Sequence, residues 1–159
     1  MDETQQLQSP DVQQRAAAAE ALSLMGPDAG AAAVELVNAC ADQETVREWA
    51  VAALEELGPP AAESRERLTA LVHADNPLVA YWAITLLGRS ESAARSSQDD
   101  LAAVLTTSTA ISVRERAAWA LGKIDADSPT ATAALQEAAS SSEARLSRIA
   151  KAALEQTQA

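Results

Sequence analysis

The chain has 159 residues, of which 48 % are hydrophobic and 3 % aromatic, and it contains no Phe. Its formal net charge of −11 argues against binding to nucleic acid or to anionic membrane surfaces, because both need clustered Lys and Arg. No apolar run approaches the roughly 20 residues of a membrane helix, and no signal peptide precedes Asp2, so we expect a cytoplasmic protein. Cys40 is the single Cys and is expected in the core, which excludes an intrachain disulfide.

The pattern predicts helices throughout, because no run alternates β-branched or aromatic residues with polar ones as strands do. Residues 3–8 predict a short polar element. Ser9-Pro10-Asp11 predicts the start of a helix that continues to about Met25, with Pro10 in its first turn. Gly26-Pro27 ends this helix, since Gly can adopt a left-handed cap and Pro cannot continue the helix.

Two further helix pairs follow. The second pair begins near Asp28, turns at residues 41–43 and ends at residues 58–60. The third pair turns at residues 75–77 and ends near residues 88–89. Residues 90–98 have the weakest pattern, and there we expect a loop with some helical character that is the most mobile segment of the chain.

The last two pairs complete the chain. The fourth pair turns at Ser108-Thr109 and closes at residues 125–129. The fifth pair turns at residues 140–142, and its last helix runs from Glu143 to about Gln156. Its polar character is typical of a solvent-facing end cap.

One sequence pattern recurs in the second helix of each pair. Residues 46–58 read VREWAVAALEELG and residues 113–125 read VRERAAWALGKID. The apolar positions fall at 0, +4, +8 and +11, which form one stripe of an α-helix. All five copies keep Ala at +4 and Leu at +8. The first positions are spaced by 32, 33, 34 and 33 residues, and they are Gln14, Val46, Val79, Val113 and Leu146.

This pattern resembles the HEAT repeat, in the short bacterial form also called the PBS-lyase HEAT-like repeat. The resemblance rests on the two segments above, with Asp42 and the turn at residues 75–77 ahead of two copies. It implies an all-α, right-handed α-solenoid (an alpha-alpha superhelix) whose second helices line the concave side. We expect one domain over residues 1–159 with about five HEAT-like helix pairs, at approximately 1–26, 27–58, 59–89, 90–125 and 126–159.

The resemblance also implies a ladder of polar pairs between repeats, made by an Asp before the second helix and an Arg at +1. Here only the second copy has both residues of this pattern, with Asp42 before the helix and Arg47 at +1. Ala80 and Ser147 replace the Arg in two later copies. We therefore expect apolar packing to hold the stack more than polar pairs do.

Few residues could support catalysis or bind a metal. His73 is the single His and is expected to cap a helix end or lie on the surface. One Cys and one His do not make a metal site, and no glycine-rich phosphate loop occurs. We therefore expect no catalytic residue, no cofactor and no metal.

The aromatic residues are the candidate site. Trp49 and Trp82 share position +3 in adjacent repeats, Tyr81 lies beside them at +2, and Trp119 stands at +6. Two interpretations are open, since these side chains either fill gaps left by so much Ala or form a partner surface rich in Trp, Tyr and Arg. The candidate partner-binding residues, with two cations at the rim, are Trp49, Tyr81, Trp82, Arg116, Trp119 and Lys123.

Residues 1–79 hold 14 acidic and 4 basic side chains, whereas residues 80–159 hold 9 and 8, so a partner with a basic segment fits the first half. We expect a non-enzymatic protein- or peptide-binding scaffold that is a monomer or weak dimer. One alternative is a subunit like the bilin (phycocyanobilin) lyases, to which the repeat name refers. Another is a structural domain of a larger protein. A HEAT-like DNA glycosylase is disfavoured, because those enzymes use a basic inner groove.

Overall fold

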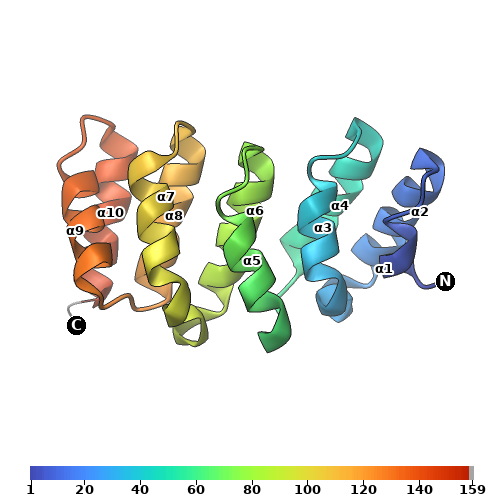
Figure 1. Cartoon of the computed structure of the whole chain (residues 1–159), viewed down its shortest axis with the longest axis horizontal. Coiled ribbons are helices and arrows are strands. Elements are labelled where there is room, and N and C mark those ends of the chain that lie inside the picture. The colour runs from blue at the N-terminus through green and yellow to red at the C-terminus, as the bar shows by residue number, and fades with distance from the viewer. Residues whose placement is uncertain (158–159) are drawn as a thin grey trace. The chain divides into compact units, whose positions relative to one another are not determined.

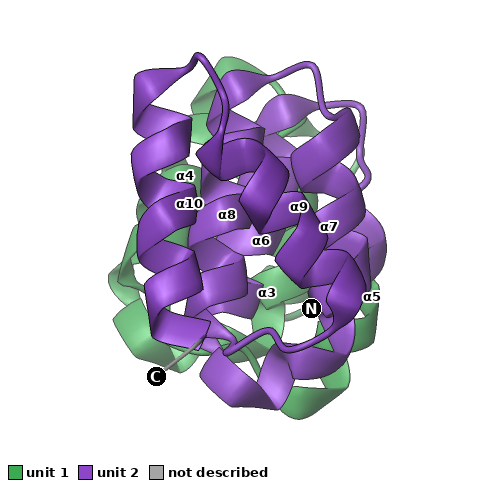
Figure 2. Cartoon of the chain, turned by 90° about the vertical axis from the view of Figure 1, so that its left-hand side faces the viewer, with its two compact units in different colours: residues 1–67 green, residues 68–159 purple. Residues whose placement is uncertain are grey.

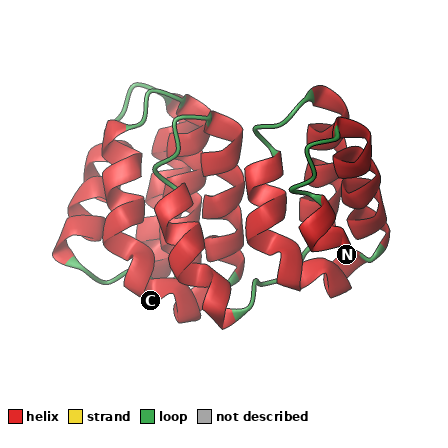
Figure 3. Ribbon diagram, turned by 45° about the vertical axis from the view of Figure 1, so that its right-hand side comes forward, coloured by secondary structure: helices red, strands yellow, loops and turns green. Residues whose placement is uncertain are grey.

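A computed structural model describes residues 1–157 of the chain. Helices joined by short turns make up this part of the chain, and no strand occurs within it (Figures 1 and 3). The predicted all-helical class is therefore confirmed. The chain divides into two compact units, Met1–Arg67 and Leu68–Ala159 (Figure 2).

Unit 1 contains two helix pairs and the start of a third. Asp2 and Asp11 cap its first two helices, each by accepting a hydrogen bond from a backbone N–H of the first turn. Pro10 precedes the cap, so its predicted place in the first turn was wrong. The elements are α1 (Glu3–Gln6), α2 (Val12–Leu24), the 3₁₀ helix η1 (Gly26–Ala32), α3 (Ala33–Ala39), α4 (Glu44–Glu56), η2 (Ala62–Ser64) and the beginning of α5 (Arg65–Leu71).

Unit 2 contains the remaining helices in two layers. Helices α6, α8 and α10 pack side by side in one layer, and α7 and α9 pack side by side in the other (Figures 1 and 2). Two starts use Pro at N1 or N2 after a polar cap, Asn76 before α6 and Ser128 before α9. The elements after α5 are α6 (Pro77–Arg89), η3 (Glu91–Ser97), α7 (Gln98–Thr107), α8 (Ile111–Lys123), α9 (Pro129–Ala139) and α10 (Ala144–Thr157).

Short 3₁₀ helices precede the first helix of three of the pairs, namely α3, α5 and α7. Gly26 opens η1 with φ of +56°, the left-handed conformation expected at this position. The expected loop at residues 90–98 is instead largely the 3₁₀ helix η3. Ala94 and Ser97 of η3 are buried, and the Ser97 hydroxyl lies 2.7 Å from that of Thr69. Sequence patterning missed η3 because it buries only these small residues.

The repeat positions account for the core. Every Ala at +4 is buried, and every first position except Gln14 is buried. The Leu at +8 is buried in four copies, while Leu154 in the last copy is partly exposed. Small residues at fixed positions let the helices approach closely while Leu and Val fill the space between them.

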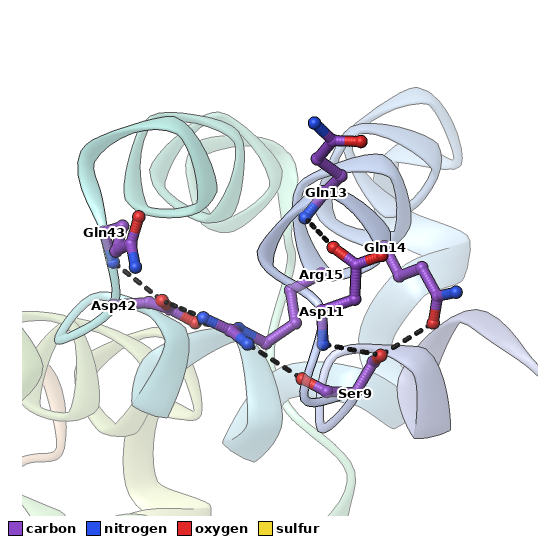
Figure 4. A network of polar contacts seen from close by, with 7 residues as sticks. All are labelled: Ser9, Asp11, Gln13, Gln14, Arg15, Asp42 and Gln43. Carbon is purple, nitrogen blue, oxygen red and sulfur yellow. Dashed lines mark hydrogen bonds and ion pairs between the residues drawn. The ribbon is translucent and has the colours of Figure 1, made fainter.

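A polar pair joins the first two repeats. Asp42 pairs with Arg15 of the preceding repeat, at 2.7 Å from Nε to Oδ2 and 2.9 Å from Nη2 to Oδ1 (Figure 4). Hydrogen bonds from the Arg15 guanidinium lower the pKa of the Asp42 carboxyl, and the same contact raises the pKa of Arg15. The ladder that the resemblance implies therefore forms here between the Arg at +1 of one repeat and the Asp of the next.

Candidate functional site

Three side chains from two helices form an aromatic–arginine cluster in unit 2. Arg116 and Trp119 lie one turn apart on α8, and Tyr81 comes from the neighbouring α6. The Arg116 Cζ atom lies 4.6 Å from the centroid of the Tyr81 ring and 4.7 Å from that of the Trp119 ring. Nη2 of Arg116 also donates a hydrogen bond to the Tyr81 hydroxyl oxygen. Two cation–π contacts and this hydrogen bond fix the position of the guanidinium.

The surrounding helices hold both rings in place. Trp119 packs over Gly88 of α6, where an added Cβ would lie 2.8 Å from the ring atom Cη2. Tyr81 meets Trp82 edge to face, with ring centroids 5.6 Å apart and an interplanar angle of 81°. Trp82 is 7 % exposed, so it anchors Tyr81 from the interior. Because Gly88 has no side chain, the Trp119 ring can pack directly against α6.

The cluster borders a pocket of about 280 Å³ between α6, α8 and α10, which we call the cluster pocket. Glu115 and Arg145 lie across it, with Arg145 Nε 3.2 Å from Glu115 Oε2. The Glu115 side chain is 16 % exposed, while that of Arg145 is 70 % exposed. The pocket therefore combines two cations, one carboxylate and apolar walls. Its lining residues are Tyr81, Ser112, Glu115, Arg116, Trp119, Arg145 and Ile149.

The structure brings together three of the six residues proposed from the sequence. Tyr81, Arg116 and Trp119 form the cluster, whereas Lys123 is exposed at the end of α8 and does not line the pocket. Trp82 is buried below the cluster, with Arg89 Cζ 5.7 Å from its ring centroid.

Trp49 belongs to α4 of unit 1 and is 39 % exposed. Trp49 and Trp82 therefore lie in different environments, although they share position +3. For Trp82 the gap-filling interpretation matches its burial.

Sequence reasoning missed Ser112, Glu115, Arg145 and Ile149, although the repeat register contained a signal for them. Equal positions of successive repeats lie next to one another when helices stack in register. Ser112 and Arg145 share position −1. Arg116 and Ile149 share +3, and Tyr81 and Glu115 share +2. Selection by residue type, aromatic with cations at the rim, makes no use of this register and leaves these neighbours out.

The other chemically notable residues lie away from the pocket. His73 is exposed, as expected, and its Nε2 lies 2.8 Å from Asp100 Oδ1. Cys40 is buried, and desolvation raises the pKa of its thiol to about 12. Within residues 1–157, no group of three or more His, Cys, Asp and Glu side chains is placed to hold a metal ion. No helix of this part is long and apolar enough to cross a membrane.

Comparison with solved structures identifies the fold. Three crystal structures of engineered proteins from the Northeast Structural Genomics Consortium match 97–99 % of this chain at 20–21 % identity. Their TM-scores are 0.65, 0.66 and 0.66, and the matches cover 77 %, 47 % and 78 % of the engineered chains. At this identity the likeness concerns the fold, and it confirms the predicted α-solenoid class. No curated protein matches the chain.

Comparison with family models gives the same result. The model described as HEAT repeats matches residues 64–155, which is more than half of the chain. HEAT repeats form helical scaffolds that commonly serve protein interaction. The resemblance seen in the repeated second helices is confirmed, and the chain belongs to the family of HEAT repeat proteins.

Proposed function

We propose that this chain is a non-enzymatic scaffold that binds a protein or peptide through the cluster pocket of unit 2. One observation carries the proposal. Arg116 is held against two aromatic rings at the edge of a pocket formed by three helices, and no carboxylate of residues 1–157 forms an ion pair with it.

The composition of the cluster supports this use. Trp, Tyr and Arg are the residue types that most often dominate the binding energy of protein interfaces. A side chain that is already held in one position loses less conformational entropy when a partner binds. The family's common role in protein interaction agrees with the same proposal.

The proposed surface is narrower than the one expected from the sequence. Tyr81, Arg116 and Trp119 would contact the partner, and Trp82 would support them from beneath. Lys123 would act at the rim through long-range charge alone. A basic segment of a partner would suit unit 1 instead, whose residues hold 13 acidic and 4 basic side chains.

Selection of a displayed random-peptide library on the immobilised full chain tests the proposal. The affinities of selected peptides are then measured for wild type, Trp119→Ala and Trp49→Ala. We expect Trp119→Ala to weaken binding at least about tenfold, the usual cost of losing an aromatic hot spot. Trp49→Ala is the matched control in unit 1 and should leave the affinity unchanged.

A Trp119→Phe variant separates binding from packing, because it keeps an aromatic ring over Gly88. Circular dichroism confirms that each variant keeps the helical content of the wild type. If no peptide is enriched, or if every enriched peptide binds Trp119→Ala as tightly as the wild type, the cluster pocket is not a binding site.

A further inference from the structure

We infer that the cluster pocket takes a carboxylate side chain from an acidic segment of the partner protein. This inference rests on the proposed function and names the chemistry of its partner. It follows from how unit 2 distributes its charges and from the state of the Arg116 guanidinium.

Positive charge in unit 2 is concentrated in one layer of helices. Helices α6, α8 and α10 carry seven basic and two acidic side chains, whereas η3, α7 and α9 carry one basic and four acidic ones. The pocket opens between the three basic helices. The basic side chains of this layer are Arg89, Arg114, Arg116, Lys123, Arg145, Arg148 and Lys151.

Arg116 has hydrogen-bonding capacity to spare. A guanidinium carries five N–H donors in a planar fork, which suits a carboxylate bound through two parallel hydrogen bonds. Among residues 1–157, Arg116 donates one hydrogen bond, to the hydroxyl of Tyr81. Arg15 and Arg95, by contrast, each pair with an Asp at 2.7 Å. Arg116 therefore has donors for an acceptor from another molecule.

The rest of the pocket favours the same ligand. Arg145 offsets the charge of Glu115, which leaves the pair neutral and Arg116 as the net charge of the lining. Ile149 and Trp119 supply apolar surface for the methylene groups of a Glu or for a neighbouring apolar residue. Beyond the pocket, α8 and α10 also carry the exposed cations Lys123, Arg148 and Lys151, which is more positive charge than one C-terminal carboxylate would use. We therefore assign the pocket to side chains of an acidic segment.

A nucleic acid fits this surface less well. Single strands bind proteins by stacking bases on the open faces of aromatic rings. Here the Arg116 guanidinium already lies against both the Tyr81 ring and the Trp119 ring. Glu115 in the lining and the net charge of −11 also oppose a phosphate backbone.

Fluorescence polarisation with three labelled probes tests the inference on the full chain. The probes are a short peptide of Glu, Leu and Gly, the same peptide with Gln in place of every Glu, and a single-stranded oligothymidylate. We expect the Glu peptide to bind at least about tenfold tighter than the Gln peptide, because a hydrogen bond to a charged group is the stronger kind.

Variants then assign the binding to Arg116. Arg116→Gln should weaken the Glu peptide about tenfold to a hundredfold. Arg67→Gln removes the same charge from an exposed site in unit 1 and should change the affinity less than about twofold. Glu115→Gln removes the carboxylate of the pocket and should tighten binding a few-fold, so the inference stays testable even if Arg116→Gln loses its fold.

Three outcomes would overturn the inference. The first is that the Gln peptide binds as tightly as the Glu peptide, and the second is that Glu115→Gln does not tighten binding. The third is that the oligothymidylate binds more tightly than either peptide. The proposed function is contradicted by a different result, namely that the selected library peptides bind Trp119→Ala as tightly as wild type. Selected peptides that need Trp119 but lack acidic residues would therefore keep the scaffold and reject the carboxylate.

Discussion

At the residue scale, position +1 of the repeat makes polar connections of two kinds. Arg15 uses it to reach Asp42 of the next repeat. Arg114 and Ser147 use it to donate to backbone carbonyls of the preceding helix, at Leu105 (2.8 Å) and Ala139 (2.6 Å). Carbonyls near the end of a helix have no partner within it, so these bonds satisfy them and fix the turn inside the fourth and fifth pairs.

Cys40 gives the clearest prediction at this scale. Its thiol is 1 % exposed, its Sγ lies 3.6 Å from the Leu36 carbonyl oxygen, and its pKa is raised from 9.0 to about 12. The unfolded chain deprotonates the thiol near pH 9, whereas the folded chain keeps its proton. The contribution of this thiol to the free energy of unfolding is therefore fully present below about pH 9. It decreases between pH 9 and 12 by roughly 1.4 kcal/mol per pH unit.

Chemical denaturation of wild type and Cys40→Ala between pH 8 and 10.5 measures this effect. The free energy of unfolding of wild type should decline more steeply than that of the variant, which shares every other side chain and so serves as the control. Parallel curves would contradict it. A thiol reagent should also modify native wild type slowly at neutral pH and react at once after unfolding.

At the element scale, two glycines leave space for contacts between neighbouring second helices of unit 2. Gly88 lets Trp119 of α8 lie against α6, and Gly122 lets α10 lie against α8. Both stand at position +9 of their copies, where the second copy has Glu55. The pattern of Ala at +4 and Leu at +8 describes the buried stripe, and these glycines mark the contact between neighbouring second helices.

Gly122→Ala tests this contact. The added methyl group would lie 3.0 Å from both Cα and Cβ of Ala153, so α10 would have to shift. We expect the free energy of unfolding to fall by roughly 1–3 kcal/mol, as in other overpacked sites. Urea denaturation followed by circular dichroism measures the change.

Gly30→Ala is the matched control, because an added Cβ there meets nothing within 4 Å. It should leave stability unchanged or raise it slightly, since Ala restricts the unfolded chain. Equal losses in the two variants would mean that glycine at position 122 is not needed for close packing.

At the scale of the whole molecule, the two units differ strongly in charge. Unit 1 holds 13 acidic and 4 basic side chains, and unit 2 holds 10 and 8. Unit 1 therefore carries −9 of the total of −11. Like charges within one compact body repel one another and lower its stability, and salt screens this repulsion.

We predict that added salt raises the stability of the folded chain between about 0.01 M and 0.15 M ionic strength, because screening changes strongly over this range. The Debye length falls from about 30 Å at 0.01 M to about 8 Å at 0.15 M. The melting temperature followed by circular dichroism should rise by several degrees between these concentrations. The fluorescence of Trp49 in a Trp82→Phe, Trp119→Phe background should show this rise for unit 1. An unchanged or falling midpoint would mean that ion pairs such as Arg15–Asp42 outweigh the repulsion.

Part of the candidate site could be predicted from the sequence. Tyr81, Arg116 and Trp119 were chosen as aromatic and cationic residues of the repeated helices, and the structure brings them into contact. Trp49 and Trp82 could not be told apart, because a shared repeat position does not determine how deeply a side chain is covered. Glu115 and Arg145 were missed, because their pairing depends on which residues face each other across two helices.

By itself, the sequence determined the helical class, the repeat spacing and most of the buried positions. These follow from a period that local chain geometry sets, since residues at 0, +4, +8 and +11 must share one helix face. Only the tertiary structure decided the partner of Asp42, the 3₁₀ form of residues 91–97 and the pocket between α6, α8 and α10. Those features depend on contacts between residues about 27–35 positions apart, which local periodicity does not encode.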